Sequence, residues 1–391
     1  MTASKLSRIH SIDFARGLVM VIMALDHCRD LLHIDSMTQS PTDLATTTPI
    51  LFFTRWITHL CAPIFVFLSG VSAFLSLQQH GDVRESRRFL LSRGIWLILL
   101  ECTVVSFGIW FDIYFRVLFF QVIAAIGCGF IVLALLIRVS PKWLGVAGLV
   151  IIFAHDLLSG VALPANPVAR ILGSILLARG VFPSPHFTFF VGYPVLPWTG
   201  ILLTGYACGQ LFIYAPDRRR RLFVRIGLGA LLLFVLLRYT NIYGDPAPWS
   251  VQKNAVYSLL SFLNVSKYPP SLLYTLVTLG ILFLLLAATE GRHNRFISIF
   301  AVYGKVPLFY YLIHWYIVHS IMLVMVFAQG FPLSELVFGA FSFGRPKAGS
   351  GLTLPYVYLV WLGVIVLMYP LCRWYGQYKM AHKENKWLRY L

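Results

Sequence analysis

The stretch that decides the fold is IDFARGLVMVIMALDHCRDLLH, residues 12–33. Its apolar middle is long enough for a helix that crosses a bilayer, which needs about 20 residues. The same stretch carries several ionisable side chains: Asp13, Arg16, Asp26, His27, Arg29 and Asp30. Because charge inside a bilayer is costly and usually marks a functional site, we interpret this stretch as a first membrane helix with a functional role. The alternative is that these charges only pair with one another between helices.

Arg16 and His27 are eleven residues apart. At about 100° per residue, this spacing puts both side chains on one helix face, about 16 Å apart along the axis. A histidine with a carboxylate partner is a common general base near neutral pH. Asp30 lies near the same face as His27 and is expected to orient its imidazole, whereas Asp26 points elsewhere. We take His27, Asp26 and Asp30 as candidate catalytic residues.

The composition of the chain indicates a membrane protein. Of its 391 residues, 58% are hydrophobic and only 12% are charged, whereas soluble domains average about 25% charged residues. We expect no cleavable signal peptide before the first helix, because the helix keeps its charges and has no small-residue cleavage site. The six cysteines show no zinc-like spacing, so they are interpreted as packing residues and no metal site is expected.

About ten apolar segments have the length of a membrane helix, and together they predict an all-α polytopic membrane protein. We treat residues 1–391 as a single transmembrane domain. The predicted spans are 13–33, 56–78, 94–111, 117–137, 143–160, 196–215, 222–240, 269–289, 306–328 and 355–374.

The distribution of positive charge predicts the orientation. If the amino terminus lies inside, the inner segments hold 21 of the 32 Lys and Arg residues and the outer segments hold 8. Cytoplasmic segments carry such an excess, so both termini are predicted to be cytoplasmic. The net charge of +17 then belongs mainly to the inner membrane face, and no nucleic-acid partner is expected.

With this orientation, four histidines on four different helices fall in the outer half of the membrane. They are His27, His59, His155 and either His314 or His319. Depth alone suggests that they converge, and His59 and His314 are added to the candidate catalytic residues. The outer loops are rich in aromatic and polar residues, as at 183–198 and 243–250. Such loops suit a carbohydrate or another polar acceptor, and equally suit anchoring at the membrane interface.

The inner face offers a place for a phosphate-rich donor. Arginine side chains match phosphate oxygens, and a helix start adds a favourable dipole. A long donor with a phosphate-rich head could bind there and extend past Arg16 toward His27, and acyl-coenzyme A has this shape. The alternative is that these residues are ordinary cytoplasmic anchors. The candidate donor-binding residues are Arg16, Arg84, Arg87, Arg88, Arg93 and Lys305, and 217–225 repeats the basic pattern.

Several stretches resemble the bacterial branch of the heparan-alpha-glucosaminide N-acetyltransferase catalytic-domain family. The resemblance is carried by RIHSIDFARGLVMVIMALDHCRDLL (8–32) and FFTRWITHLCAPIFVFLSG (52–70), and by the stretches 193–209, 304–319 and 369–379. Arg16 and His27 also match the Arg–ten residues–His pattern of the related acyltransferase-3 family. The FLSG sequence at 67–70 is similar to that family's second-helix signature.

The resemblance implies transfer of an acetyl group from cytosolic acetyl-CoA to a sugar or similar polar acceptor, an amine or a hydroxyl, across the membrane. It makes His27 the catalytic histidine and Arg16 a donor-binding residue, with His33 and His59 as further candidates. It also implies an integral protein of a prokaryotic plasma membrane, with the lipid bilayer as its surroundings. A homodimer is possible.

Two alternatives stay open. The acceptor could attack acetyl-CoA directly with His27 as base, or a histidine could first take the acetyl group. The same intramembrane charges could instead form the proton relay of a transporter for a polar or anionic solute, with Pro63 and Pro307 as helix breaks. The sequence contains no clear internal repeat of the kind that many transporters show. It also lacks the GxxxxGK[ST], GxSxG and HExxH motifs.

Overall fold

The computed structural model describes residues 9–158, 160–339, 341–346 and 349–390, and these ranges are predominantly helical. The strands are β1 (Val117–Phe120), β2 (Gly180–Pro183) and β3 (Thr188–Val191). The α-helices are α1 (His10–Leu32), α2 (Pro49–Trp56), α3 (Cys61–His80), α4 (Val83–Leu100), α5 (Ser106–Trp110), α6 (Val122–Leu136), α7 (Pro141–Ala154), α8 (Pro167–Leu177), α9 (Val195–Cys208), α10 (Pro216–Thr240), α11 (Ala255–Leu263), α12 (Leu272–Thr289), α13 (Arg295–Gly304), α14 (Pro307–Ala328) and α15 (Leu354–Ala381).

Within the described ranges, seven helical segments are long and apolar enough to cross a membrane. They are Pro49–Gln79, Val83–Trp110, Pro141–Leu158, Pro216–Thr240, Leu272–Thr289, Pro307–Ala328 and Leu354–Ala381. Three other predicted spans coincide with α1, α6 and α9. The first carries five Asp and Arg side chains, and the other two are only 15 and 14 residues long. The helical membrane fold is confirmed, and the count of about ten spans stays a prediction.

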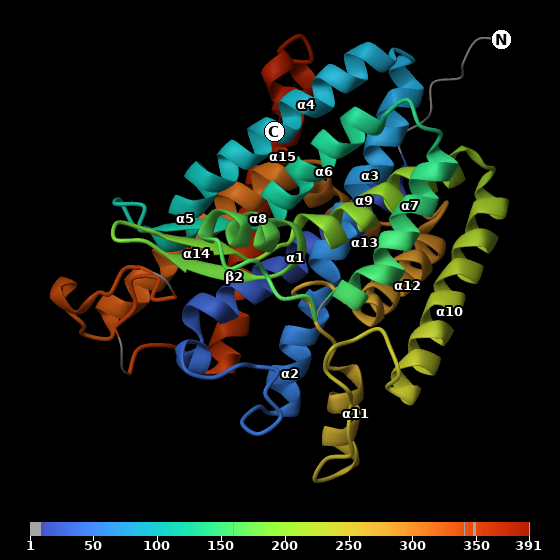
Figure 1. Cartoon of the computed structure of the whole chain (residues 1–391). Coiled ribbons are helices and arrows are strands. Elements are labelled where there is room, and N and C mark those ends of the chain that lie inside the picture. The colour runs from blue at the N-terminus through green and yellow to red at the C-terminus, as the bar shows by residue number, and fades with distance from the viewer. Residues whose placement is uncertain (1–8, 159, 340, 347–348, 391) are drawn as a thin grey trace.

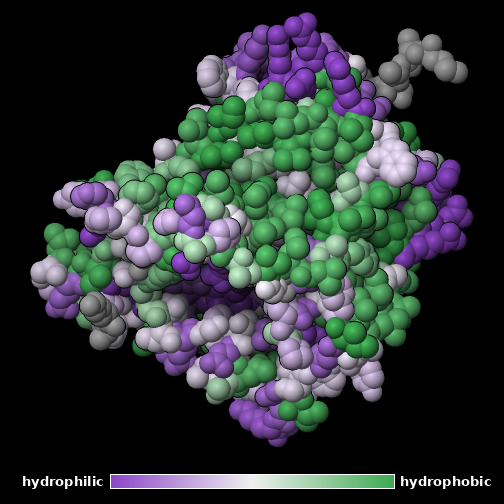
Figure 2. Space-filling view, viewed as in Figure 1, coloured by the Kyte–Doolittle hydropathy of each residue, from purple (hydrophilic) through white to green (hydrophobic). Residues whose placement is uncertain are grey.

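The surface agrees with a membrane location. Figure 2 shows a broad band of hydrophobic residues between two more hydrophilic ends, and a hollow with hydrophilic walls on one side below the band. Exposed leucines and valines cover α10 and α15, as at Leu232 and Val366. In Figure 1, α10 runs along one edge of the molecule, and α2 and α11 extend from the same end. The exposed apolar faces of α10 and α15 are the ones suited to contact with lipid.

Helix α1 lies at the centre of the bundle and contacts α3, α12, α13, α14 and α15. Most of its 23 residues are buried, as the cost of exposing its charges to lipid requires. Hydrogen bonds from neighbouring helices reach its backbone: Trp361 Nε1 donates to the Val21 carbonyl (2.8 Å) and Cys61 Sγ to the Val19 carbonyl (3.4 Å). These bonds tie the middle of α1 to α3 and α15.

A pair of glycines lets α1 and α13 pack backbone against backbone. A Cβ atom on Gly17 would collide with the backbone oxygen of Phe300, and a Cβ on Gly304 with that of Asp13. Small residues at helix crossings are typical of membrane helices, because they allow close van der Waals contact. This crossing fixes the Arg16 end of α1 against the start of α14.

The prediction of a purely helical chain was wrong in one detail, a small three-stranded sheet. Its order is β1–β3–β2, with β1 parallel and β2 antiparallel to β3. The predicted span 117–137 therefore begins as a strand, and α6 starts only at Val122. Phe119 and Phe190 stack across the sheet with ring centroids 4.5 Å apart. The sheet walls the site at the His27 end of α1.

Two buried arginines hold the long loops at the same end of the molecule. Arg238 donates to four backbone carbonyls of the segment 247–264. Arg345 donates to the carbonyls of Leu31 (3.3 Å) and His33 (3.0 Å), and so ties the loop before α15 to the end of α1. Burial lowers the pKa of Arg345 to about 10. These bonds tie the long loops to α10 and to the end of α1.

Candidate active site

Three cavities follow one another along α1 and α14. The Arg16 cavity measures about 290 Å³ and is lined by Arg16 and Pro307, among others. The apolar cavity, about 110 Å³, continues past Met23 and Tyr311. The His27 cavity, about 180 Å³, begins at the next turn of each helix, with Asp26 and Trp315. The series runs from a basic end to a histidine end, as the spacing in the first helix predicted.

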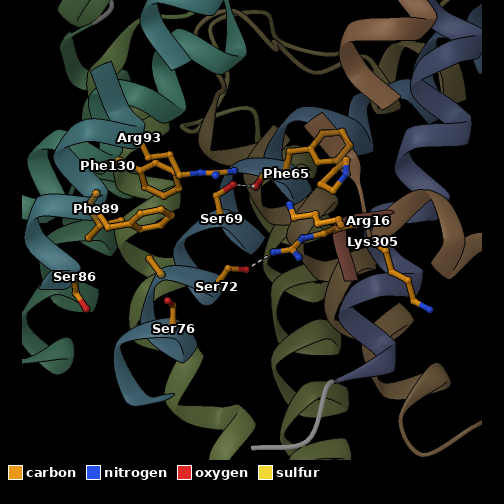
Figure 3. Close-up of a pocket in the computed structure, with 14 residues that line it drawn as sticks. Arg16, Phe65, Ser69, Ser72, Ser76, Ser86, Phe89, Arg93, Phe130 and Lys305 are labelled. Atoms are coloured by element: carbon orange, nitrogen blue, oxygen red, sulfur yellow. Dashed lines mark hydrogen bonds between the residues drawn. The ribbon is translucent and has the colours of Figure 1, made fainter. Parts of the chain in front are cut away.

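The Arg16 cavity is basic and rich in hydroxyl groups. Its positive charges come from three helices, at Arg16, Arg93 and Lys379, and from Lys305 in the turn between α13 and α14. Figure 3 shows Arg16 and Arg93 reaching toward the space between them from opposite sides, with serines of α3 below. Arg16 donates to the Leu68 carbonyl (3.0 Å) and to Ser72 Oγ. Of the predicted donor-binding residues, the structure brings Arg16, Arg93 and Lys305 to this one cavity.

The apolar cavity adjoins the Arg16 cavity, because both are lined by Phe65, Ser69, Arg93, Phe130 and Pro307. Most of its exposed wall area is carbon. It extends away from the basic residues and ends at Met23 of α1 and Tyr311 of α14. Its shape and chemistry suit a narrow chain with little charge, connected to a charged head in the Arg16 cavity.

His27 lines the third cavity and is in direct contact with His314, which is fully buried behind it. His27 Nδ1 lies 2.6 Å from His314 Nε2, and the His27 ring stacks on Trp315 with centroids 3.8 Å apart. His314 Nδ1 lies 2.9 Å from the Tyr310 carbonyl, which can only accept a hydrogen bond. Neutral His314 therefore carries its proton on Nδ1, and its Nε2 accepts from His27 Nδ1. This network leaves the lone pair of His27 on Nε2, where it can take a proton.

The two aspartates are placed differently from the prediction. Arg29 lies between them and donates to Asp26 (2.7 Å) and to Asp30 (2.5 Å). Arg55 of α2 also donates to Asp26, at 3.5 Å. The expectation that Asp30 orients His27 is not met, since Arg29 is a stronger, charge-assisted partner for the carboxylate. His314 takes the position beside the imidazole of His27.

The other histidines do not join the pair. His59 is buried against Tyr274, which donates to the His59 carbonyl, and it does not line the His27 cavity. His155 pairs with Asp156 at 3.3 Å. His319 stacks on Phe111, with ring centroids 3.8 Å apart. His33 Nδ1 accepts from the Asp35 amide beyond α1. Of the four predicted outer histidines, the structure thus brings together two.

The predicted arginine cluster at the start of α4 is divided. Arg93 reaches the Arg16 cavity, while Arg84 and Arg87 line a separate surface hollow with Arg138, and Arg88 is exposed. Arg93 is nine residues after Arg84, and at about 100° per residue this places the two side chains on opposite faces of α4. In the basic stretch 217–225, Arg219 is buried and pairs with Glu290.

Several residues of the His27 cavity were not predicted. Lys267 and Tyr268 lie in the loop before α12, and Trp315 and Tyr193 add aromatic surface. Burial by itself raises the pKa of Tyr268, but the positive charges of Lys267 and Arg55 together outweigh it and lower that pKa. The sequence offered one signal, a run of Lys, Tyr and Pro directly before an apolar helix, at 267–270.

The described residues contain no group of three His, Cys, Asp or Glu side chains placed to hold a metal ion. The His27–His314 pair can carry out acid–base chemistry, at the end of a series of cavities that starts from a basic one. Together with the apolar helices, these features define an integral membrane protein with a candidate group-transfer site.

The chain belongs to the heparan-alpha-glucosaminide N-acetyltransferase catalytic family, whose model matches residues 8–237 of the 391. Transfer of an acetyl group is the activity for which this family is named. A comparison with curated proteins found no match. The matched range contains Arg16, His27 and Arg93, while Lys305 and His314 lie beyond it. The resemblance expected at 304–319 and 369–379 also lies beyond the match and stays a prediction.

Proposed function

We propose that this protein transfers an acetyl group from acetyl-CoA, bound in the Arg16 cavity, to a polar acceptor in the His27 cavity. The observation that carries the proposal is the series of cavities from a cluster of four cations to a histidine pair. Both termini lie in the cytoplasm, so the donor enters from the cytosol and the acceptor from the outer side of a prokaryotic plasma membrane. The whole chain acts as one transmembrane domain.

The residues present fit the donor. The phosphates of coenzyme A carry several negative charges, and guanidinium groups bind phosphate oxygens well. Arg16 and Arg93 supply two such groups, and Lys305 and Lys379 add further positive charge. The pantetheine arm is long and thin and matches the apolar cavity. The thioester would then lie near Tyr311 and Trp315, next to His27.

The His27 cavity suits a sugar or a similar polar acceptor. Aromatic rings of Tyr193, Tyr268 and Trp315 line it together with the charged groups of Lys267 and Asp30. Such a mixture offers faces for stacking and groups for hydrogen bonding. An amine and a hydroxyl both fit this environment.

The chemical step follows from the tautomers of the two histidines. His27 Nε2 takes the proton of the acceptor's amine or hydroxyl as the acceptor attacks the thioester carbon. The C–S bond then breaks, and the proton passes from His27 to the departing thiolate. While His27 is protonated, its Nδ1–H donates to His314 Nε2, which stabilises the imidazolium. A covalent acetyl-histidine at His27 is the alternative, and release of CoA from acetyl-CoA without acceptor, in a single turnover, would indicate it.

The first test is binding. A ligand that binds only the folded protein raises its melting temperature. We expect CoA and acetyl-CoA to stabilise the purified protein, and Arg16→Ala to weaken this effect relative to Arg220→Ala, since Arg220 is exposed on α10. Stabilisation by a small solute but by neither CoA compound would refute the proposal in favour of transport.

The second test is activity. His27→Ala should abolish acetyl transfer to a panel of amino sugars and sugars while the protein keeps its melting temperature. The matched control is His186→Ala, because His186 is exposed in the β2–β3 turn. Full transfer by His27→Ala would show that another group is the base.

A further inference from the structure

Two polar side chains on α14 lie where the apolar cavity ends and the His27 cavity begins. Tyr311 lines the apolar cavity, and Trp315 lines the His27 cavity. They are four residues apart, so they lie on the same helix face, one above the other. On the proposed function, the reacting carbonyl of the donor must pass this position to reach His27.

Both side chains are deeply buried, and each retains an unused hydrogen-bond donor. Each residue is 5% exposed. Tyr311 Oη and Trp315 Nε1 interact with each other, but neither makes a hydrogen bond of standard geometry to any residue that the structure describes. Buried polar groups without a partner are uncommon and call for an explanation. Trp96, Trp198 and Trp249 also have an unpartnered indole nitrogen, but they line none of the three cavities. Trp110 Nε1 is unpartnered too, and Trp110 lines the His27 cavity, where its ring stacks on Phe343; Trp315 differs from it in stacking on His27 and in lying one turn from Tyr311.

We propose that Tyr311 Oη and Trp315 Nε1 bind the carbonyl oxygen of the donor's thioester and stabilise the oxyanion of the tetrahedral intermediate. This inference rests on the proposed acetyl transfer. Both groups can donate a hydrogen bond, and a carbonyl oxygen accepts two. Donors placed where negative charge develops are among the largest single contributions to catalysis of acyl transfer.

The position of Trp315 relative to the base supports this assignment. Its indole ring stacks on the imidazole of His27 at 3.8 Å, with an angle of 21° between the planes. A carbonyl bound at the indole N–H therefore lies beside the imidazole that takes the acceptor's proton. The acceptor forms its bond to the carbonyl carbon, and the C–O π electrons move onto the oxygen held by Tyr311 and Trp315. When the carbonyl re-forms, CoA leaves as thiolate and takes the proton from His27.

The test uses two variants: Tyr311→Phe removes only the hydroxyl oxygen, and Trp315→Phe removes the indole N–H while it keeps a smaller aromatic ring. Each should lower kcat about 10²- to 10³-fold, the loss typical of one oxyanion donor. The controls are Tyr375→Phe and Trp96→Phe, since Tyr375 Oη and Trp96 Nε1 are also unpartnered but lie outside the three cavities.

Binding separates this inference from the proposed function. S-ethyl-CoA has the size of acetyl-CoA without its carbonyl oxygen. The wild-type protein should bind acetyl-CoA about tenfold more tightly than S-ethyl-CoA, which corresponds to one or two ordinary hydrogen bonds, and the variants should lose this preference. If the variants bind both compounds as the wild type does, with kcat equal to that of the controls, the assignment of Tyr311 and Trp315 is wrong. If neither compound binds to the wild-type protein, the proposed function itself fails.

Discussion

His314 Nε2 accepts from His27 Nδ1, and this bond decides which nitrogen of His27 faces the reaction. Periodicity in the first helix pointed to Arg16 and His27 on one face, because the pattern lies within one helix. It could not show that His314, nearly three hundred residues away, would be the partner of His27. The same periodicity favoured Asp30 as the partner of His27. It could not show that Arg29 would instead bind both the Asp26 and the Asp30 carboxylates.

Removing the acceptor on His314 should reduce catalysis. His314→Leu leaves the Nδ1–H of His27 without a partner, so the imidazolium loses its stabilisation and the tautomer is no longer fixed. We expect kcat to fall about 10²-fold, within the range of general-base effects, and His314→Gln to restore part of it because its amide oxygen can accept. Steady-state kinetics with acetyl-CoA would measure this, and equal kcat values for the two variants would contradict the role of the hydrogen bond.

At the level of single elements, α6 begins inside the bundle, where its first amide groups need a partner. The carboxylate of Glu101, in the π-helical turn η3 (Glu101–Val105) that follows α4, accepts from the amides of Ile123 (2.9 Å) and Ala124 (3.1 Å). Glu101 is fully buried. The sequence showed a glutamate within an apolar span, but not that it caps another helix.

Replacing this carboxylate should destabilise the protein. Glu101→Leu leaves two buried amides without an acceptor, which costs about 1–3 kcal/mol for each group. Glu101→Gln keeps one oxygen in place and should cost clearly less. Melting temperatures in detergent would compare the two, with Thr103→Val of the same turn as control. A Leu variant as stable as the Gln variant would show that the cap is not required.

The crossing of α1 and α13 is a second test at this scale. Gly304→Ala places a methyl group against the backbone of Asp13, and overpacking of this kind costs about 1–3 kcal/mol. Gly363→Ala on α15 meets no atom within 4 Å and should be neutral or slightly stabilising, as for an unhindered helical glycine. A thermal unfolding series would show the difference, and equal stability of the two variants would contradict the close packing.

For the whole molecule, the loop before α15 covers the His27 cavity. Phe341 and Phe343 of this loop line the cavity, and Arg345 ties the loop to the end of α1. Arg345→Met should loosen the loop, because the five oxygen atoms to which the guanidinium now donates lose this donor. Amide exchange over 336–346 should become faster, and the KM for the acceptor should rise while binding of acetyl-CoA is unchanged. Weaker acetyl-CoA binding with an unchanged loop would contradict this arrangement.

The helical membrane architecture could be predicted from the apolar segments alone, because the length and hydropathy that a membrane helix needs are local properties of the sequence. The Arg16 cavity was partly predicted, since Arg16, Arg93 and Lys305 all lie near predicted helix ends. The sheet, the loop cations such as Lys267 and the aromatic residues of the His27 cavity were not, because tertiary packing places them and no local pattern records it.

The central position of α1 has a consequence for the biosynthesis of the protein. Chains are made from the amino terminus, so α1 leaves the ribosome first, while α13, α14 and α15, which enclose it, come last. Before those helices arrive, some of its ionic groups already have partners within α1 itself. Arg29 bridges Asp26 and Asp30 on the same helix, so most of the charge near His27 is neutralised before any later helix arrives. The first helix thus carries its own counter-ions through the insertion machinery.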